Sequence, residues 1–215
     1  MTYELLSSTE RDAIVSEQLR AKLPSLGLTE RSVRSWIAKS EGPVRRLFEI
    51  YLMRGAKLRL CWGFSLDFVP HISAGRVRWH RTEKSALLDV TVDPRDLQQP
   101  SYLHGAARLV ESLKALLKEV AERADRSWKA GGTFHGMLEM IKDIRERHTN
   151  RFDFSNYAQL PLAFAFLSAK TGDLETAEKE INQLILHRRL DEDEAAKLKK
   201  LAMDYAESSA SQRVK

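Results

Sequence analysis

The amino-acid sequence predicts an α+β protein with an N-terminal helix, a four- to five-stranded antiparallel sheet and a helical C-terminal half. Between residues 31 and 93, apolar residues recur with the period of two that is typical of half-buried strands. After residue 94 they recur at helical spacing. No helical pattern separates the predicted strands from one another, so we expect an antiparallel meander rather than a parallel sheet.

Length and composition agree with a globular fold. The chain has 215 residues, of which 43% are hydrophobic and 30% charged, which excludes collagen-like and disordered chains and allows one or two domains. The single cysteine, Cys61, cannot form an internal disulfide, so we expect a reducing, cytoplasmic compartment. The sequence begins without a signal-peptide pattern, and no stretch reaches the roughly 20 apolar residues of a membrane span.

The first predicted element is a helix over residues 10–23. Ser8 and Thr9 are residues that commonly precede a helix, and Pro24 ends it. Its apolar face consists of Ile14, Val15, Leu19 and Leu23.

The clearest predicted strand covers residues 57–68, where a large apolar residue fills every second position. This apolar face consists of Leu58, Leu60, Trp62, Phe64, Leu66 and Phe68. The opposite face, which we expect to be polar, carries Lys57, Arg59, Cys61, Gly63, Ser65 and Asp67. Further strands are predicted at 46–53, 76–81 and 86–92, and residues 33–38 are a candidate for a fifth.

The C-terminal half predicts helices over residues 106–126, 133–147, 156–170, 174–187 and 192–208. The last of these has mixed charge, which is typical of a solvated helix. We expect an α+β domain over residues 1–150 and a helical extension packed on it over residues 151–215.

Basic residues are concentrated in the predicted sheet. Residues 31–84 contain twelve Lys or Arg and four Asp or Glu, whereas the whole chain has a net charge of only +5. Three tryptophans, Trp36, Trp62 and Trp79, lie in the same segment. A cationic face with exposed rings would suit nucleic acid, but Trp62 and Trp79 fall on apolar faces, which favours the core. The residues that we expect to contact a partner are Arg59, Arg76, Arg78 and His80.

Three acidic residues, Asp67, Asp89 and Asp93, alternate onto the same predicted face as His80. Together they form a polar cluster that could serve a metal-dependent hydrolase, although cross-strand ion pairs explain the same residues. The six histidines show no metal-ligand spacing, and Cys61 lies in mid-strand rather than at a reactive position, so no metal or cofactor is expected.

A helical pair near the C-terminus resembles half of a tetratricopeptide repeat. The resemblance covers residues 163–185 and rests on Gly172, Asp173 and Ala177. Ser168 and Leu184 depart from the repeat pattern, and no second copy is present. The resemblance implies a protein-binding role.

Residues 36–93 resemble small bacterial α+β domains of unknown function, some of which look like accessory or immunity proteins of conflict systems. The matching features are the Trp62-Gly63 pair in a hydrophobic strand and the acidic closing strand at 87–93. The resemblance supplies no catalytic residue. It implies an interaction protein. Together with the missing catalytic motif, the polar sheet face and the repeat-like helices, this leads us to expect a non-catalytic binding protein that acts through protein–protein contact. Nucleic-acid binding by the basic face and metal-dependent hydrolysis are the alternatives.

Overall fold

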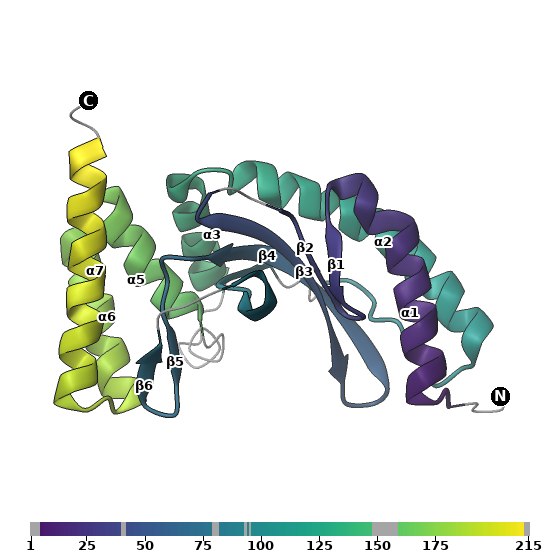
Figure 1. Cartoon of the computed structure of the whole chain (residues 1–215). Coiled ribbons are helices and arrows are strands. Elements are labelled where there is room, and N and C mark those ends of the chain that lie inside the picture. Colours follow the sequence, from purple (N-terminus) through teal and green to yellow (C-terminus); the bar gives the residue numbers. More distant parts are fainter. Residues whose placement is uncertain are drawn as a thin grey trace. The chain divides into compact units, whose positions relative to one another are not determined.

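The computed structural model describes residues 5–39, 42–78, 82–92, 94, 96–147 and 159–212, with side chains described up to residue 205 (Figure 1). The chain has the predicted α+β class. It forms two compact units, each built from two separate stretches. The first unit comprises Met1–Ser65 and Thr91–Lys129, and the second comprises Leu66–Val90 and Ala130–Lys215. The boundary expected at residue 150 lies outside the described residues and stays a prediction.

The first unit begins with helix α1 (Ser8–Lys22), close to the predicted range. The Ser7 hydroxyl accepts a hydrogen bond from the Glu10 amide, and the Glu10 carboxylate accepts one from the Ser7 amide. This capping box satisfies two amide groups that the helix start leaves unpaired. A short 3-10 helix, η1 (Leu23–Leu26), follows and ends at Gly27, whose φ of 74° suits glycine.

The main sheet has five strands in the order β1-β2-β3-β4-β7. These strands are β1 (Thr29–Ser32), β2 (Ser35–Ile37), β3 (Val44–Met53), β4 (Lys57–Leu66) and β7 (Val90–Val92). The pairing of β2 with β3 is antiparallel and sets Trp36 opposite Phe48, both of which are buried. The candidate strand at 33–38 is therefore present as β2, and the tryptophan within it belongs to the core.

The predicted strand at 76–81 does not join this sheet, and in this respect the expected meander is wrong. Instead, β6 (Arg76–Arg78) pairs with β5 (His71–Ser73) in a separate two-stranded sheet, which we call the β5–β6 ribbon. Ala74 and Gly75 between them have φ values of 50° and 72°. Two consecutive left-handed residues form a tight hairpin turn, so the chain returns at once along the strand it has just left.

The face of β4 expected to be polar is open only at its start. Lys57 is exposed and Arg59 half-buried, whereas every residue from Leu60 to Leu66 is buried. Cys61, Gly63 and Ser65 are small enough for other parts of the protein to approach the strand closely on that side.

Helix α2 (Ala106–Ala130) covers the apolar side of the sheet in the first unit. Leu58 and Leu60 of β4 lie beside Leu116 and Val120 of this helix. At the far end of α2, the Trp128 indole N–H donates a hydrogen bond of 3.0 Å to the Gly63 carbonyl. Apolar packing and this hydrogen bond together fix α2 along β4.

The second unit contains four described helices and the short η2 (Glu83–Ser85). The helices are α3 (Phe134–Arg147), α5 (Leu160–Thr171), α6 (Leu174–Arg188) and α7 (Glu192–Gln212), close to the predicted ranges. Helix α5 is buried on almost every side and packs against α3, α6 and α7. The Arg145 guanidinium of α3 lies 2.7 Å from the buried Glu180 carboxylate of α6, which adds a polar link around α5.

Candidate interaction site

The β5–β6 ribbon carries two of the residues expected to contact a partner. Arg76 and Arg78 are exposed, and Val77 between them is 2% exposed. Because side chains alternate along a strand, the two arginines share one face of the ribbon. Their cross-strand neighbours on that face are Ser73 and His71. His80 and Asp93 lie outside the described residues.

Helix α7 holds this ribbon by its backbone. The Val77 amide donates a hydrogen bond of 2.6 Å to Glu194 Oε2, and Lys197 Nζ donates one of 2.6 Å to the Val77 carbonyl. The same two side chains lie 3.6 Å apart as an ion pair on α7. We call Glu194 and Lys197 the edge clamp, because they satisfy both backbone groups of Val77 that a neighbouring strand would otherwise satisfy.

A second contact holds the other strand of the ribbon. Gln159 Nε2, just before α5, lies 2.9 Å from His71 Nδ1, and His71 is half-buried. Both strands are thus tied to the helices of the second unit, so the backbone that carries Arg76 and Arg78 is positioned before any partner arrives.

Arg76 and Arg78 are themselves available for binding. Within the described part of the chain, neither guanidinium forms a hydrogen bond or an ion pair. Each presents five N–H donors in a planar arrangement that matches a carboxylate or a phosphate. The exposed face therefore offers two adjacent anion-binding groups on a fixed backbone.

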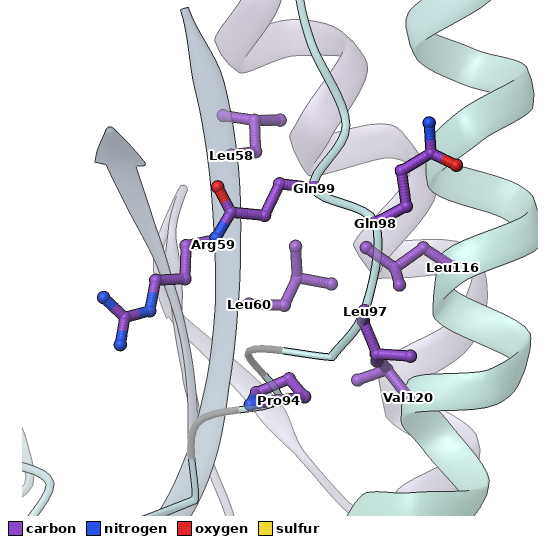
Figure 2. Close-up of a pocket in the computed structure, with 9 residues that line it drawn as sticks. All are labelled: Leu58, Arg59, Leu60, Pro94, Leu97, Gln98, Gln99, Leu116 and Val120. Carbon is purple, nitrogen blue, oxygen red and sulfur yellow. The ribbon is translucent and has the colours of Figure 1, made fainter. Parts of the chain in front are cut away.

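Arg59 does not belong to this surface. It lies on β4 of the main sheet, so the expectation that it shares a sheet face with Arg76 and Arg78 is wrong. It borders a small pocket in the first unit, with room for little more than a water molecule. Figure 2 shows that its guanidinium points away from the apolar side chains of Leu60, Leu97 and Val120. The alternation of β4 explains this direction, because Leu58 and Leu60 occupy the other face.

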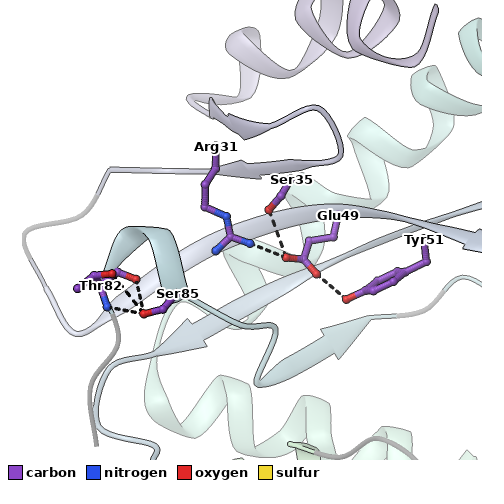
Figure 3. A network of polar contacts seen from close by, with 6 residues as sticks. All are labelled: Arg31, Ser35, Glu49, Tyr51, Thr82 and Ser85. Atoms are coloured by element: carbon purple, nitrogen blue, oxygen red, sulfur yellow. Dashed lines mark hydrogen bonds and ion pairs between the residues drawn. The ribbon is translucent and has the colours of Figure 1, made fainter. Parts of the chain in front are cut away.

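Other polar groups of the main sheet are paired internally (Figure 3). Glu49 accepts hydrogen bonds from Arg31 at 2.8 Å, Ser35 at 3.2 Å and the Tyr51 hydroxyl. Burial and the Glu49 hydrogen bond raise the pKa of Tyr51. Burial also raises the pKa of the Cys61 thiol to about 11, so the thiol stays protonated at neutral pH and is a poor nucleophile.

Asp89 is not an exposed member of a polar cluster, and its predicted position is wrong. Its side chain has no exposed surface and accepts a hydrogen bond of 2.7 Å from the Leu66 amide. The strand β7 begins only at Val90, so the alternation assumed for residues 86–92 does not apply to Asp89. Asp67 is half-buried just beyond β4. The buried Asp89 removes a central residue from the site on which the hydrolase alternative depends.

The edge clamp was not predicted from the sequence. Glu194 and Lys197 were interpreted as part of a solvated helix, and their spacing of three residues is common on helix surfaces. No local signal pairs them with Val77, because that contact joins positions 117 and 120 residues apart.

The described residues contain no group of three or more His, Cys, Asp or Glu side chains arranged to hold a metal ion. Over the same described ranges, no helix combines the length and the apolar character needed to cross a membrane.

Comparison with known proteins found no matching family model, no matching curated protein and no matching solved structure.

Proposed function

We propose that this protein is a non-catalytic binding protein that recognises an acidic surface of a protein partner through Arg76 and Arg78. The observation that carries this proposal is the pair of exposed arginines, without an internal partner in the described chain, on a ribbon held by the edge clamp. A preformed backbone reduces the ordering cost of association. The proposal places the protein in the cytoplasm, in keeping with its single reduced cysteine.

The spacing of the two arginines suits carboxylates. Residues two apart on a strand lie about 7 Å from each other, the separation of alternate side chains in an extended acidic segment. Arg binds a carboxylate through two parallel N–H···O bonds, which gives direction as well as attraction. A partner with two acidic side chains at alternate positions is therefore the best match.

Nucleic acid is the competing partner, because arginine binds phosphate equally well. Tight sequence-independent binding normally depends on many phosphate contacts and on exposed rings that stack on bases. Trp36 and Trp62 are 2% and 1% exposed, so neither offers a stacking surface. Trp79 lies outside the described residues. Two arginines on a short ribbon favour the protein partner.

A charge reversal tests the proposal. The full-length protein is cross-linked in nuclease-treated lysate of its source cells, and partners are identified by mass spectrometry. For the partner found, the Arg76→Glu/Arg78→Glu variant should bind at least about tenfold more weakly, since each exposed ionic contact is replaced by repulsion. The loss should shrink as salt is raised.

The matched control is Arg108→Glu/Arg126→Glu, which makes the same charge change at two exposed positions of α2. This variant should bind the partner normally. Equal loss in both variants would show a general charge effect and contradict the assignment. Titration of labelled single-stranded DNA, duplex DNA and RNA between about 50 and 200 mM salt separates the alternatives. Tight binding that falls steeply with salt would overturn the protein proposal in favour of nucleic acid.

A further inference from the structure

Three aromatic rings surround the ammonium group of Lys170 in the second unit. Lys170 Nζ lies 5.9 Å from the ring centroid of Phe68, 5.9 Å from that of Phe134 and 5.2 Å from that of Tyr205. The rings also contact one another. The Phe68 and Phe134 centroids are 5.4 Å apart at an interplanar angle of 79°, and those of Phe68 and Tyr205 are 6.0 Å apart. We call these three rings the aromatic cage.

The cage is assembled from distant parts of the sequence. Phe68 follows β4, Phe134 begins α3, Tyr205 lies on α7, and Lys170 occupies the last turn of α5. The packing of α5 against α3 and α7 brings them together. Three separate elements therefore hold the rings in place, and the rings do not depend on Lys170 alone for their position.

Lys170 is held there by the rings rather than by an acceptor. Within the described residues its ammonium makes no hydrogen bond and no ion pair. Burial lowers its pKa, because the charged form loses contacts with water. An ammonium has three N–H donors that need acceptors, whereas an aromatic face offers only its electron-rich surface. A cation without N–H groups would meet the same rings without leaving donors unsatisfied.

The cage is also reachable from solvent. Phe68 is 2% exposed, whereas Phe134, Tyr205 and Lys170 are each half-buried and keep part of their surface in solvent. A lysine side chain can leave the rings by a change of rotamer, without any change in the backbone, because its four-carbon chain is flexible.

From this geometry we propose that the aromatic cage is a binding site for a trimethylammonium group and that Lys170 is the internal cation that fills it when no ligand is bound. Three rings around one point is the arrangement by which proteins recognise quaternary ammonium ions. The ligand class has two sources, a small quaternary amine or a trimethylated lysine on another protein. This site is independent of the surface formed by Arg76 and Arg78.

The test is a titration with tetramethylammonium chloride, followed by the NMR shift of its methyl protons, against sodium chloride at equal ionic strength. Aromatic faces shift bound methyl protons upfield, so binding should give a saturable shift. The wild-type protein should bind, and Lys170→Ala should bind roughly tenfold more tightly because the internal competitor is gone. Lys179→Ala, at an exposed position of α6, is the matched control and should behave as wild type.

Two cage variants connect the signal to the rings. Phe134→Leu and Tyr205→Leu keep apolar volume but remove a π face, and both positions are only half-buried, so we expect both variants to fold. Each should weaken binding of tetramethylammonium severalfold, in wild type and in the Lys170→Ala background. Thermal unfolding of each variant confirms that the comparison is made on folded protein.

Three results would overturn the proposal. The first is no saturable shift in either wild type or Lys170→Ala, which would make the Lys170 contact purely structural. The second is an unchanged shift in both cage variants. The third is binding by Lys170→Ala alone, which would show that a ligand does not displace Lys170. Where binding is seen, choline and a trimethyl-lysine peptide, each against its unmethylated form, distinguish a small amine from a protein as the source.

Discussion

The buried carboxylate of Asp89 has a structural role, because it accepts a backbone hydrogen bond at the end of β4. It has no exposed surface, and its Oδ2 accepts the Leu66 amide hydrogen at 2.7 Å. A backbone N–H that is buried without an acceptor costs about 1–3 kcal/mol, so this side chain secures the end of β4. The contact fixes the chain where it leaves the main sheet.

Replacement of Asp89 should therefore destabilise the fold. We expect Asp89→Ala to lower the free energy of unfolding by about 1–3 kcal/mol, because the Leu66 amide loses its acceptor. Asp89→Asn keeps a carbonyl oxygen and should lose less. Urea denaturation measures both. Asp143→Ala, at an exposed position of α3, should stay within about 0.5 kcal/mol of wild type. An Asp89→Ala variant as stable as the control would contradict the structural role.

For single residues, the sequence predicted burial correctly where the type of residue decides whether it is buried. Trp62 was expected in the core because it shares a face with leucines, and it is buried. Asp89 was misplaced because the residues before β7 are not a strand, and alternation can be read only where a strand exists. The aromatic cage around Lys170 gave no local signal, since its three rings come from positions far apart in the sequence.

The β5–β6 ribbon depends on helix α7 for its stability. Two strands of three residues each are too short to be stable alone in water. The edge clamp of Glu194 and Lys197 supplies the hydrogen bonds that a third strand would have made. The ribbon therefore behaves as part of the helical unit rather than as a free hairpin.

Loss of the clamp should loosen the ribbon locally. In Glu194→Ala, the Val77 amide loses its acceptor, and we expect its hydrogen exchange to accelerate about tenfold to a hundredfold. Residue-resolved exchange measured by NMR checks this. Glu192→Ala, at an exposed position in the first turn of the same helix, is the control and should leave the Val77 rate unchanged. Equal rates in the two variants would mean that the clamp does not hold β6.

The positions of the helices and strands were predicted better than the way in which the strands pair and are covered. The helix ranges agree closely because apolar stripes such as that of α2 repeat over many turns. The alternation of β4 identified the strand but did not show that its second face is also buried, since Cys61, Gly63 and Ser65 are small and uncharged. The pairing of β6 depends on β5 and on the left-handed turn at Ala74 and Gly75, and no strand was predicted before that turn.

The two units are interleaved along the chain. Leu66–Val90 belongs with Ala130–Lys215, so a cut in the middle of the sequence does not separate one unit from the other. Helix α3 packs on α5, and its Arg145 pairs with Glu180 at 2.7 Å. A fragment that ends at residue 150 would keep less than half of the second unit, without the helices that bury it.

We therefore expect the fragment of residues 1–150 to fold incompletely. Its Val77 amide should exchange freely, and its exposed apolar surface should bind a hydrophobic dye, because α5 and α7 are missing. The full chain, measured in parallel, should show a protected Val77 and little dye binding. A fragment that protects Val77 as the full chain does would instead support an independent domain over residues 1–150.

During synthesis, Val77 leaves the ribosome well before Glu194, the residue that accepts its amide hydrogen bond. The two residues are 117 positions apart. At about 5–20 residues per second, a ribosome takes about 6–23 s to make the intervening chain. For that interval the outer edge of β6 has an open N–H and an open C=O, the groups by which nascent strands pair with wrong neighbours. The exposed edge is covered once Glu194 and Lys197 of α7 have emerged, so the speed of translation between β6 and α7 governs how long the nascent protein can mispair.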